Sequence, residues 1–189
     1  MRIALDIDST LHHYWDVLAE VARRRFGAEL PYEAQRTWGI TTIPDEQVVA
    51  CVRETHEEEN IDRGVPYPGA VETVRAWHEA GHFIHVTSHR VPESTEATAR
   101  WLERIGLPFD DLRCDFGKVG HCVSLEIDVL VDDSPVNLTG ALEAGIVPAT
   151  LLHPWNEELC ASTPEIVSGR DWAELRERLD PVLRSVPTR

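Results

Sequence analysis

The sequence predicts an α/β protein: a Rossmann-like parallel sheet with helices on both faces, and a small helical cap inserted after the first strand. Three observations lead to this prediction. Short apolar runs recur along the chain and are typical of strands buried on both faces. From about residue 65 onward, segments with helical spacing and short connections alternate with these runs. Between the first run and residue 65 the patterns are helical only.

The first strand is expected over residues 2 to about 7, within "RIALDID". The next segment, "LHHYWDVLAEVARRRFG", has apolar residues at helical spacing and stops at Gly27. A second helix begins near Pro44 and Asp45, two residues that suit a first helical turn. We therefore expect residues 11–64 to form the cap, and residues 1–10 together with 65–189 to form the α/β core.

The core elements follow one another at short intervals. A helix that ends at Gly81 leads into a strand over 83–88, and a second helix is closed by Gly106. The remaining expected elements are a short strand "DLRCDF", a short helix "VGHCVSLEI", a strand "DVLVDD", a helix "PVNLTGALEAG" and a strand "VPATLL".

Composition limits the partners. The formal charge of −15 argues against nucleic acid and anionic membranes, which need a basic surface. Phosphorylated small molecules are less excluded, because salt screens charges beyond about 8 Å and a local positive pocket can work in an acidic protein. The four cysteines form no CxxC pair, and we find no signal peptide and no apolar run of membrane-spanning length. We therefore expect reduced thiols, a cytoplasmic location and a small phosphorylated substrate; the oligomeric state stays open.

Polar side chains follow every expected strand, where ligands of open α/β sheets bind. Any one of them alone could be an ordinary helix cap. Four are carboxylates, and a pair of carboxylates 4 Å apart repels by about 4 kcal/mol at an effective dielectric of 20. A cation must therefore lie among them, and hard oxygen ligands favour Mg²⁺. The residues are Asp6, Asp8, Thr87, Ser88, Lys118, Asp132 and Asp133.

Lys118 is the only lysine in the chain. An ammonium is a compact point charge, whereas the guanidinium of arginine is a wider planar fork, so a tight site for one charge cannot exchange them. Asp128 serves as a comparison: it lies four residues before Asp132, about 13 Å away along the strand at about 3.3 Å per residue, and is assigned no role.

These residues resemble a known family. Asp6-Ile7-Asp8-Ser9-Thr10 matches the DxDx[TV] motif of the haloacid dehalogenase superfamily, and Thr87, Lys118 and "VLVDD" match its other three motifs in order. More narrowly, "IDVLVDDSPVNLTGALEAGI" and "HPWNEEL" resemble the bacterial nucleotidases related to 5'(3')-deoxyribonucleotidases. Two departures are Ser9, where that group commonly has glycine, and His89-Arg90, where several members have Ser-Pro; neither is expected to touch the core chemistry.

The resemblance implies a role for each site residue. Asp6 would attack phosphorus and form an aspartyl phosphate, and Asp8 would protonate the leaving oxygen and then deprotonate water. Thr87 would bind a phosphoryl oxygen, with Ser88 secondary, and Thr10 is also assigned to substrate binding. Lys118 would neutralise charge. Mg²⁺ would be held by Asp6, the Asp8 backbone carbonyl and Asp132, with Asp133 acting through a metal-bound water.

The function expected from this resemblance is that of a Mg²⁺-dependent phosphomonoesterase that hydrolyses nucleoside 5'-monophosphates. The cap would exclude water and set specificity; Trp15 is assigned to its apolar core and Trp38 to base stacking. A phosphatase of another small monoester, such as a sugar phosphate or phosphoglycolate, is the main alternative. A receiver-like phosphoacceptor or a non-catalytic phosphate-binding protein is a second, and the order of Lys118 before Asp132 argues against a receiver.

Overall fold

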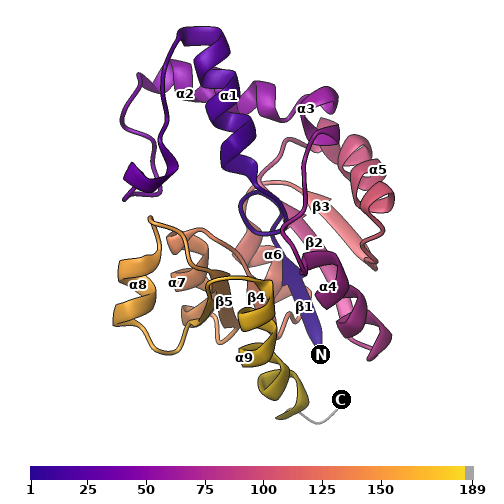
Figure 1. Cartoon of the computed structure of the whole chain (residues 1–189). Helices are drawn as coiled ribbons and strands as arrows, with labels where there is room; N and C mark the ends of the chain where they lie inside the picture. The colour runs from indigo at the N-terminus through magenta and orange to yellow at the C-terminus, as the bar shows by residue number, and fades with distance from the viewer. Residues whose placement is uncertain (186–189) are drawn as a thin grey trace.

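The computed structural model describes residues 1–185, and within them a six-stranded parallel sheet with the order β3-β2-β1-β4-β5-β6 (Figure 1). The expected parallel α/β sheet is thus confirmed. A last strand, β6, was not expected from the sequence. The strands are β1 (Arg2–Leu5), β2 (Phe83–Ser88), β3 (Asp111–Cys114), β4 (Val129–Val131), β5 (Val147–Leu151) and β6 (Val167–Gly169).

Helices cover both faces of the sheet, because successive side chains along its strands point alternately into two apolar clusters. Ile3 and Leu5 of β1 belong to a large cluster with residues of α4 (Ala70–Glu79), α5 (Thr95–Ile105) and α9 (Trp172–Ser185). Ala4, which points the other way, packs with residues of α6 (Lys118–Ser124) and α7 (Pro135–Glu143). The sheet is therefore buried on both sides, as its apolar strands require.

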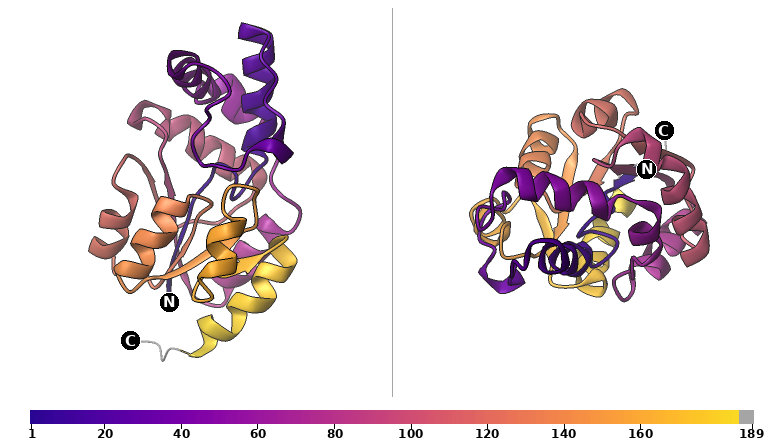
Figure 2. Two further views of the ribbon diagram at one scale, coloured as in Figure 1. Left: turned by 90° about the vertical axis from the view of Figure 1, so that its left-hand side faces the viewer. Right: turned by 90° about the horizontal axis from the view of Figure 1, so that it is seen from above.

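The insertion after β1 contains α1 (Tyr14–Phe26), the short 3₁₀ helix η1 (Tyr32–Ala34), α2 (Asp45–Thr55) and α3 (Glu58–Asp62). Helices α1 and α2 lie beyond the carboxyl ends of the central strands (Figures 1 and 2). They share a second apolar cluster, in which Trp15 is buried as expected. This apolar cluster is separate from the two clusters that flank the sheet.

Helix α3 packs on the core, although it belongs to the same insertion. Ile61 of α3 is part of the large core cluster, and Trp101 of α5 donates its indole N–H to the carbonyl of Gly64 at 2.9 Å. A Cβ atom at Gly64 would lie 3.1 Å from this indole nitrogen, so the close approach favours glycine. The two halves of the insertion thus make different contacts, while the boundary at residue 64 stays a prediction.

The core in turn extends into the cap. Trp155, in the loop between β5 and α8 (Glu157–Ser162), is 8% exposed and belongs to the same cluster as Trp15 and Leu18 of α1. Its ring centroid lies 5.6 Å from that of Trp15. The two parts of the chain are therefore joined by a shared apolar contact as well as by their peptide connections.

The four cysteines are free thiols. Among residues 1–185, no helix combines the length and the apolar character needed to cross a membrane.

Candidate active site

The strand register brings three predicted site residues together. Leu5 of β1 pairs with Val86 of β2 and with Val131 of β4. Asp6 follows Leu5, Thr87 follows Val86 and Asp132 follows Val131, so all three lie at the carboxyl end of the sheet. Asp6 continues the ladder by donating its backbone N–H to the Val131 carbonyl at 2.8 Å. Adjacent parallel strands thus place a carboxylate, a hydroxyl and a second carboxylate side by side.

Lys118 joins two of these groups. It is the first residue of α6 and follows Gly117, whose φ of +87° favours glycine. Its buried ammonium donates to Asp6 Oδ1 at 2.5 Å and to Asp132 Oδ2 at 2.6 Å. Burial alone would lower the pKa of Lys118, but Asp132 and Asp6 outweigh it and raise that pKa above its ordinary value. The lysine is therefore a fixed positive charge between two carboxylates.

Asp132 has further donors. Its Oδ1 accepts the backbone N–H of Ser134 at 2.8 Å, and the Asn137 side-chain amide donates to both carboxylate oxygens at 3.1 Å. Sequence reasoning missed Asn137. The sequence signal that could have found it is its position in the first turn of α7, a helix that begins two residues after Asp133.

Asp133 is buried, and none of the described residues donates a hydrogen bond to its carboxylate. Burial, with Asp6 and Asp132 nearby, raises the pKa of Asp133 well above its ordinary value. Burial likewise raises the pKa of Asp6 to about 7, against the opposing effect of Lys118. When ionised, three buried carboxylates face a single ammonium, so the cluster has uncompensated negative charge.

This uncompensated charge and the hard oxygen donors fit a divalent cation. Among the described residues, no three His, Cys, Asp or Glu side chains form a ready-made metal cage. Mg²⁺ does not need one, because it usually takes one or two carboxylates and completes its octahedron with water and substrate phosphate. Asp6, Asp132 and Asp133 are therefore suited to Mg²⁺, with the Asp8 carbonyl as the backbone donor that the family motif implies.

Asp8 pairs with an arginine that the sequence did not predict as its partner. The buried guanidinium of Arg90 donates from Nη2 to Asp8 Oδ1 at 2.7 Å and from Nε to Asp8 Oδ2 at 3.2 Å. Its third nitrogen, Nη1, donates to the Thr98 hydroxyl at 3.2 Å. The expectation that the His89-Arg90 departure leaves the core chemistry untouched is therefore wrong for Arg90. Sequence reasoning missed this residue because arginine is rarely buried unless it is paired.

Two histidines complete the surroundings of Asp8. His12 Nε2 lies 2.9 Å from Asp8 Oδ1, and His56 of the cap lies 3.8 Å from Asp8 Oδ2. Burial of the carboxyl alone would raise the pKa of Asp8, but Arg90, followed by His12, outweighs it and holds that pKa well below its ordinary value. The carboxylate is thus contacted by Arg90 of the core and by two histidines of the insertion after β1.

The predicted substrate-binding hydroxyls differ in their environment. The Thr87 hydroxyl has no hydrogen-bond partner among the described residues. Ser88 Oγ, in contrast, lies 3.4 Å from Asp8 Oδ2 and accepts the Arg90 backbone N–H at 3.3 Å. Thr10 is buried with an unpartnered hydroxyl, and its carbonyl accepts the Trp172 indole N–H at 3.0 Å. Among these three hydroxyls, Thr87 is the one placed at the strand end without a competing bond.

The backbone conformation of Ser9 explains why the related nucleotidases commonly have glycine at this position. Its φ is +61°, in the left-handed region that favours glycine. Its carbonyl accepts the Nε2 hydrogen of His153 at 2.7 Å, which leaves Nδ1 of His153 as the acceptor for the Tyr32 hydroxyl at 2.6 Å. A core histidine therefore connects the loop after Asp8 with the cap.

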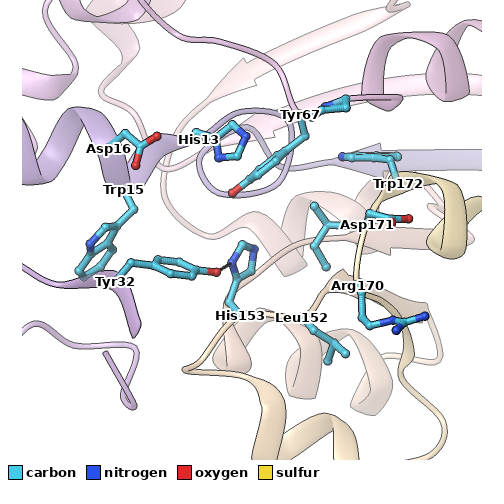
Figure 3. Close-up of a pocket in the computed structure, with 12 residues that line it drawn as sticks. His13, Trp15, Asp16, Tyr32, Tyr67, Leu152, His153, Arg170, Asp171 and Trp172 are labelled. Atoms are coloured by element: carbon cyan, nitrogen blue, oxygen red, sulfur yellow. Dashed lines mark hydrogen bonds between the residues drawn. The ribbon is translucent and has the colours of Figure 1, made fainter. Parts of the chain in front are cut away.

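A cavity of about 460 Å³ lies between cap and core, bordered by this histidine (Figure 3). The ring centroids of His13 and Tyr67 are 3.9 Å apart, and the Tyr67 hydroxyl points into the cavity (Figure 3). Trp38, the predicted stacking residue, is not among the lining residues; it is 45% exposed, with its ring centroid 6.3 Å from that of Trp155. The cavity is lined by His13, Trp15, Asp16, Tyr32, Tyr67, Pro68, Leu151, Leu152, His153, Arg170, Asp171 and Trp172.

The comparison residue Asp128 lies at the opposite end of the sheet, as expected, and accepts the backbone N–H of Arg2 at 2.7 Å. The histidines around β2 are dispersed: His85 pairs with Asp111 at 2.8 Å, while His89 stacks on Phe116 with ring centroids 5.9 Å apart. These side chains therefore do not form a shared site.

No family model matches the chain. A predicted nucleotidase of Bacillus cereus is 24% identical over 189 residues, covering 93% of this chain and 96% of that protein. A haloacid dehalogenase family hydrolase from Deinococcus radiodurans, solved with phosphate and sodium, aligns with a TM-score of 0.68 at 19% identity over 99% of this chain and 98% of that one. The chain has the haloacid dehalogenase fold.

Two further structures with this fold are described as phosphatases. A predicted phosphoglycolate phosphatase from Haemophilus somnus aligns with a TM-score of 0.67 at 16% identity, covering 93% of this chain and 96% of that one. A D,D-heptose 1,7-bisphosphate phosphatase from B. bronchiseptica was solved with magnesium and phosphate. It aligns with a TM-score of 0.57 at 13% identity, over 96% of this chain and 98% of that one. The haloacid dehalogenase fold thus extends over nearly all of this chain.

Proposed function

We propose that this protein is a Mg²⁺-dependent phosphomonoesterase that works through an aspartyl phosphate on Asp6. The observation that carries the proposal is the Lys118 ammonium between Asp6 and Asp132, next to the uncompensated carboxylate of Asp133. Such a cluster is unfavourable in a purely structural role, because buried like charges repel. It suits a site that receives a cation and a phosphoryl group together.

The chain's own groups supply each step. A carboxylate oxygen of Asp6 attacks phosphorus and the bond to the leaving oxygen breaks. That oxygen takes up a proton from the protonated form of Asp8, which is the minor form because Arg90 lowers the pKa of this carboxyl. A water oxygen then attacks the same phosphorus, Asp8 takes its proton, and the bond to Asp6 breaks to release orthophosphate. Lys118 offsets the charge of the phosphoryl oxygens, and the free Thr87 hydroxyl donates to one of them.

We propose that Asp6, Asp132 and Asp133 hold Mg²⁺, together with the Asp8 backbone carbonyl. When bound, the ion would offset the negative charge of the cluster and stabilise the charge that develops on the transferring phosphoryl group.

The substrate class that we propose is a nucleoside 5'-monophosphate. Two observations support it: the Bacillus cereus relative carries a nucleotidase name, and the cavity beside the loop after Asp8 is lined by aromatic rings on which a base can stack. Phosphatases of phosphoglycolate and of a sugar bisphosphate share the fold, which makes other small monoesters the second candidate.

The test is turnover of a panel of phosphate monoesters with the purified protein, with Mg²⁺ and with excess chelator. We expect hydrolysis that depends on Mg²⁺, is abolished in Asp6→Asn, and is fastest for nucleotides. Binding of phosphate without turnover would instead support the non-catalytic alternative. Faster hydrolysis of phosphoglycolate or sugar phosphates than of every nucleotide would change the substrate class and leave the reaction in place.

A further inference from the structure

The family motif does not require a buried arginine beside Asp8. The burial of Arg90 or of Asp8 does not by itself require the two to pair. Arg90 is 2% exposed, and among the described residues its side chain donates to oxygen atoms of Asp8 and Thr98. A buried guanidinium is costly unless it is paired with good geometry, and the fork of arginine fits both oxygens of one carboxylate. Two of the three nitrogens of this buried guanidinium therefore donate to the Asp8 carboxylate.

Three further contacts show that this orientation is specific. Thr98 of α5 holds Nη1, so the fork cannot rotate freely about its own axis. His12 approaches Asp8 Oδ1 on the same side as Arg90 Nη2. The hydroxyl of Ser88 lies near Oδ2 and also accepts the Arg90 backbone N–H. Both carboxylate oxygens of Asp8 are thus placed by donors that are themselves fixed by the core.

We propose that Arg90 is a positioning residue that orients the Asp8 carboxylate to accept the proton of the attacking water when the aspartyl phosphate on Asp6 is hydrolysed. This inference rests on the proposed function. In this step the water oxygen forms a bond to phosphorus, the bond from phosphorus to the Asp6 oxygen breaks, and the water proton passes to Asp8. Arg90 acts through Asp8 and does not touch the substrate.

The first half of the reaction depends less on this orientation when the leaving group needs no proton. The phenolate released from p-nitrophenyl phosphate is such a leaving group, since it leaves without help from an acid. In an Arg90→Met variant, Asp6 should therefore still be phosphorylated by this substrate, while release of phosphate from the enzyme slows. The phosphoenzyme should accumulate.

The experiment is rapid-quench kinetics of the full chain with p-nitrophenyl phosphate and Mg²⁺, comparing wild type, Arg90→Met and Arg90→Lys. We expect kcat to fall on the order of a hundredfold in Arg90→Met, the size of effect seen when one positioned polar group is removed from an active site. KM should fall with it and kcat/KM should stay nearly unchanged, because only hydrolysis of the phosphoenzyme is slowed. A burst of about one p-nitrophenol per enzyme and trapped phosphoenzyme should appear. Arg90→Lys should show the same burst, because an ammonium cannot contact both oxygens of Asp8.

Arg178→Met is the matched control, because Arg178 is half exposed on α9 and pairs only with Glu174 among the described residues. It should retain wild-type kinetics. Added guanidinium ion should restore part of the turnover of an Arg90→Ala variant, and not change that of an Arg178→Ala variant. Rescue of this kind is not expected if Arg90 only stabilises the fold.

Other outcomes overturn the inference. A raised KM with unchanged kcat would make Arg90 a substrate-binding residue, and an equal loss in both half-reactions, without a burst or rescue, would make its role structural. A crystal structure of the wild-type protein provides a check that does not use activity: Arg90 away from Asp8 would remove the basis of the inference. Absence of any phosphatase activity in the wild type, with the Arg90 contact present, would instead reject the proposed function and with it the assigned step.

Discussion

The hydroxyl of Tyr32, in the cap, donates to Nδ1 of His153, in the core, at 2.6 Å. The other nitrogen of the same ring, Nε2, donates to the carbonyl of Ser9 at 2.7 Å. Burial lowers the pKa of His153 to about 4, so this ring is neutral at physiological pH and one nitrogen remains an acceptor. The neutral imidazole of His153 therefore connects Tyr32 of the cap with Ser9, in the loop that carries Asp8.

Removal of this link should weaken the closed arrangement of cap and core. Tyr32→Phe deletes the hydrogen bond and retains the ring, at a typical cost of about 1 kcal/mol for a net hydrogen bond. We expect a higher KM for the preferred large substrate and unchanged kinetics with p-nitrophenyl phosphate, measured by steady-state assays. An equal effect on both substrates would show that Tyr32 does not act through the cap.

Replacement of Lys118 by arginine should abolish most activity although the charge is kept. The ammonium lies 2.5 Å from Asp6 and 2.6 Å from Asp132, and a planar fork does not fit in this space. We expect kcat to fall on the order of a hundredfold, the effect of about 3 kcal/mol of lost charge stabilisation. Near-full turnover in Lys118→Arg, with unchanged circular dichroism, would contradict the assigned role.

The raised pKa values of Asp6 and Asp133 should make these two carboxyls contribute less to the stability of the metal-free protein as the pH rises from the ordinary Asp value of 3.8 to about 7. The pKa of Asp6 is raised to about 7 and that of Asp133 is also raised, so in this window the folded state binds more protons than the unfolded state. The contribution of these two carboxyls to the free energy of unfolding then falls with increasing pH. Buried histidines such as His153, whose pKa is lowered to about 4, have the opposite sign in this window, because they bind fewer protons in the folded state. The lowered pKa of Asp8 also has the opposite sign, but its effect is lost only as the pH falls below the ordinary value.

Thermal unfolding across this pH range, with chelator and with Mg²⁺, measures the effect. Asp133→Asn removes one raised carboxyl and leaves the histidines in place, so it is the reference for this measurement. We expect the midpoint of the metal-free wild type to decrease relative to that of Asp133→Asn as the pH increases, and Mg²⁺ to stabilise the wild type more at the upper end, where protons compete less for the carboxylates. The same pH dependence in both proteins would show that the Asp133 carboxylate is not under repulsion from the cluster.

The two hydroxyls at the end of β2 should differ in their importance. Thr87 is free of hydrogen bonds to the described residues, whereas Ser88 is engaged with Arg90 and Asp8. We expect Thr87→Val, which keeps the side-chain shape, to reduce kcat more than Ser88→Ala. The opposite ranking would assign the phosphoryl contact to Ser88.

Base recognition gives a separate prediction for Trp38. The ring is 45% exposed beside Trp155, so it can offer a flat face to a base. Stacking of this kind is worth about 1 to 3 kcal/mol, so Trp38→Ala should lower kcat/KM for nucleotides by one or two decades and spare p-nitrophenyl phosphate. Tyr67→Leu is the comparison variant in the aromatic cavity. A loss confined to that variant would move the base site from Trp38 to the cavity.

The parallel sheet could be predicted from the sequence because buried strands and amphipathic helices have local patterns. The same patterns locate strand ends, so Asp6, Thr87 and Asp132 could be placed together before the register was known. The partner of Asp8 could not. Burial of Arg90 depends on the distance between the loop after β2 and the loop after β1, which no local pattern encodes.

The short strand β6 (Val167–Gly169) and the contacts of Trp155 could not be predicted for the same reason. A strand of three residues is too short for a periodic signal, and it forms here because β5 offers an edge to pair with. Trp155 lies in a loop, where a tryptophan has no predictable partner until the cap is placed above it. In both cases tertiary packing decides the structure.

The position of Trp155 also limits how this protein can be re-engineered. The insertion after β1 begins and ends next to the core, which would invite exchange of residues 11–64 with the insertion of another phosphatase to obtain a new specificity. Such a transplant would leave Trp155 without Trp15 and Leu18, and expose a side chain that is now 8% accessible. The exchangeable unit is therefore discontinuous, and a functional chimera has to take the loop from His153 to Asn156 from the same donor as the helices.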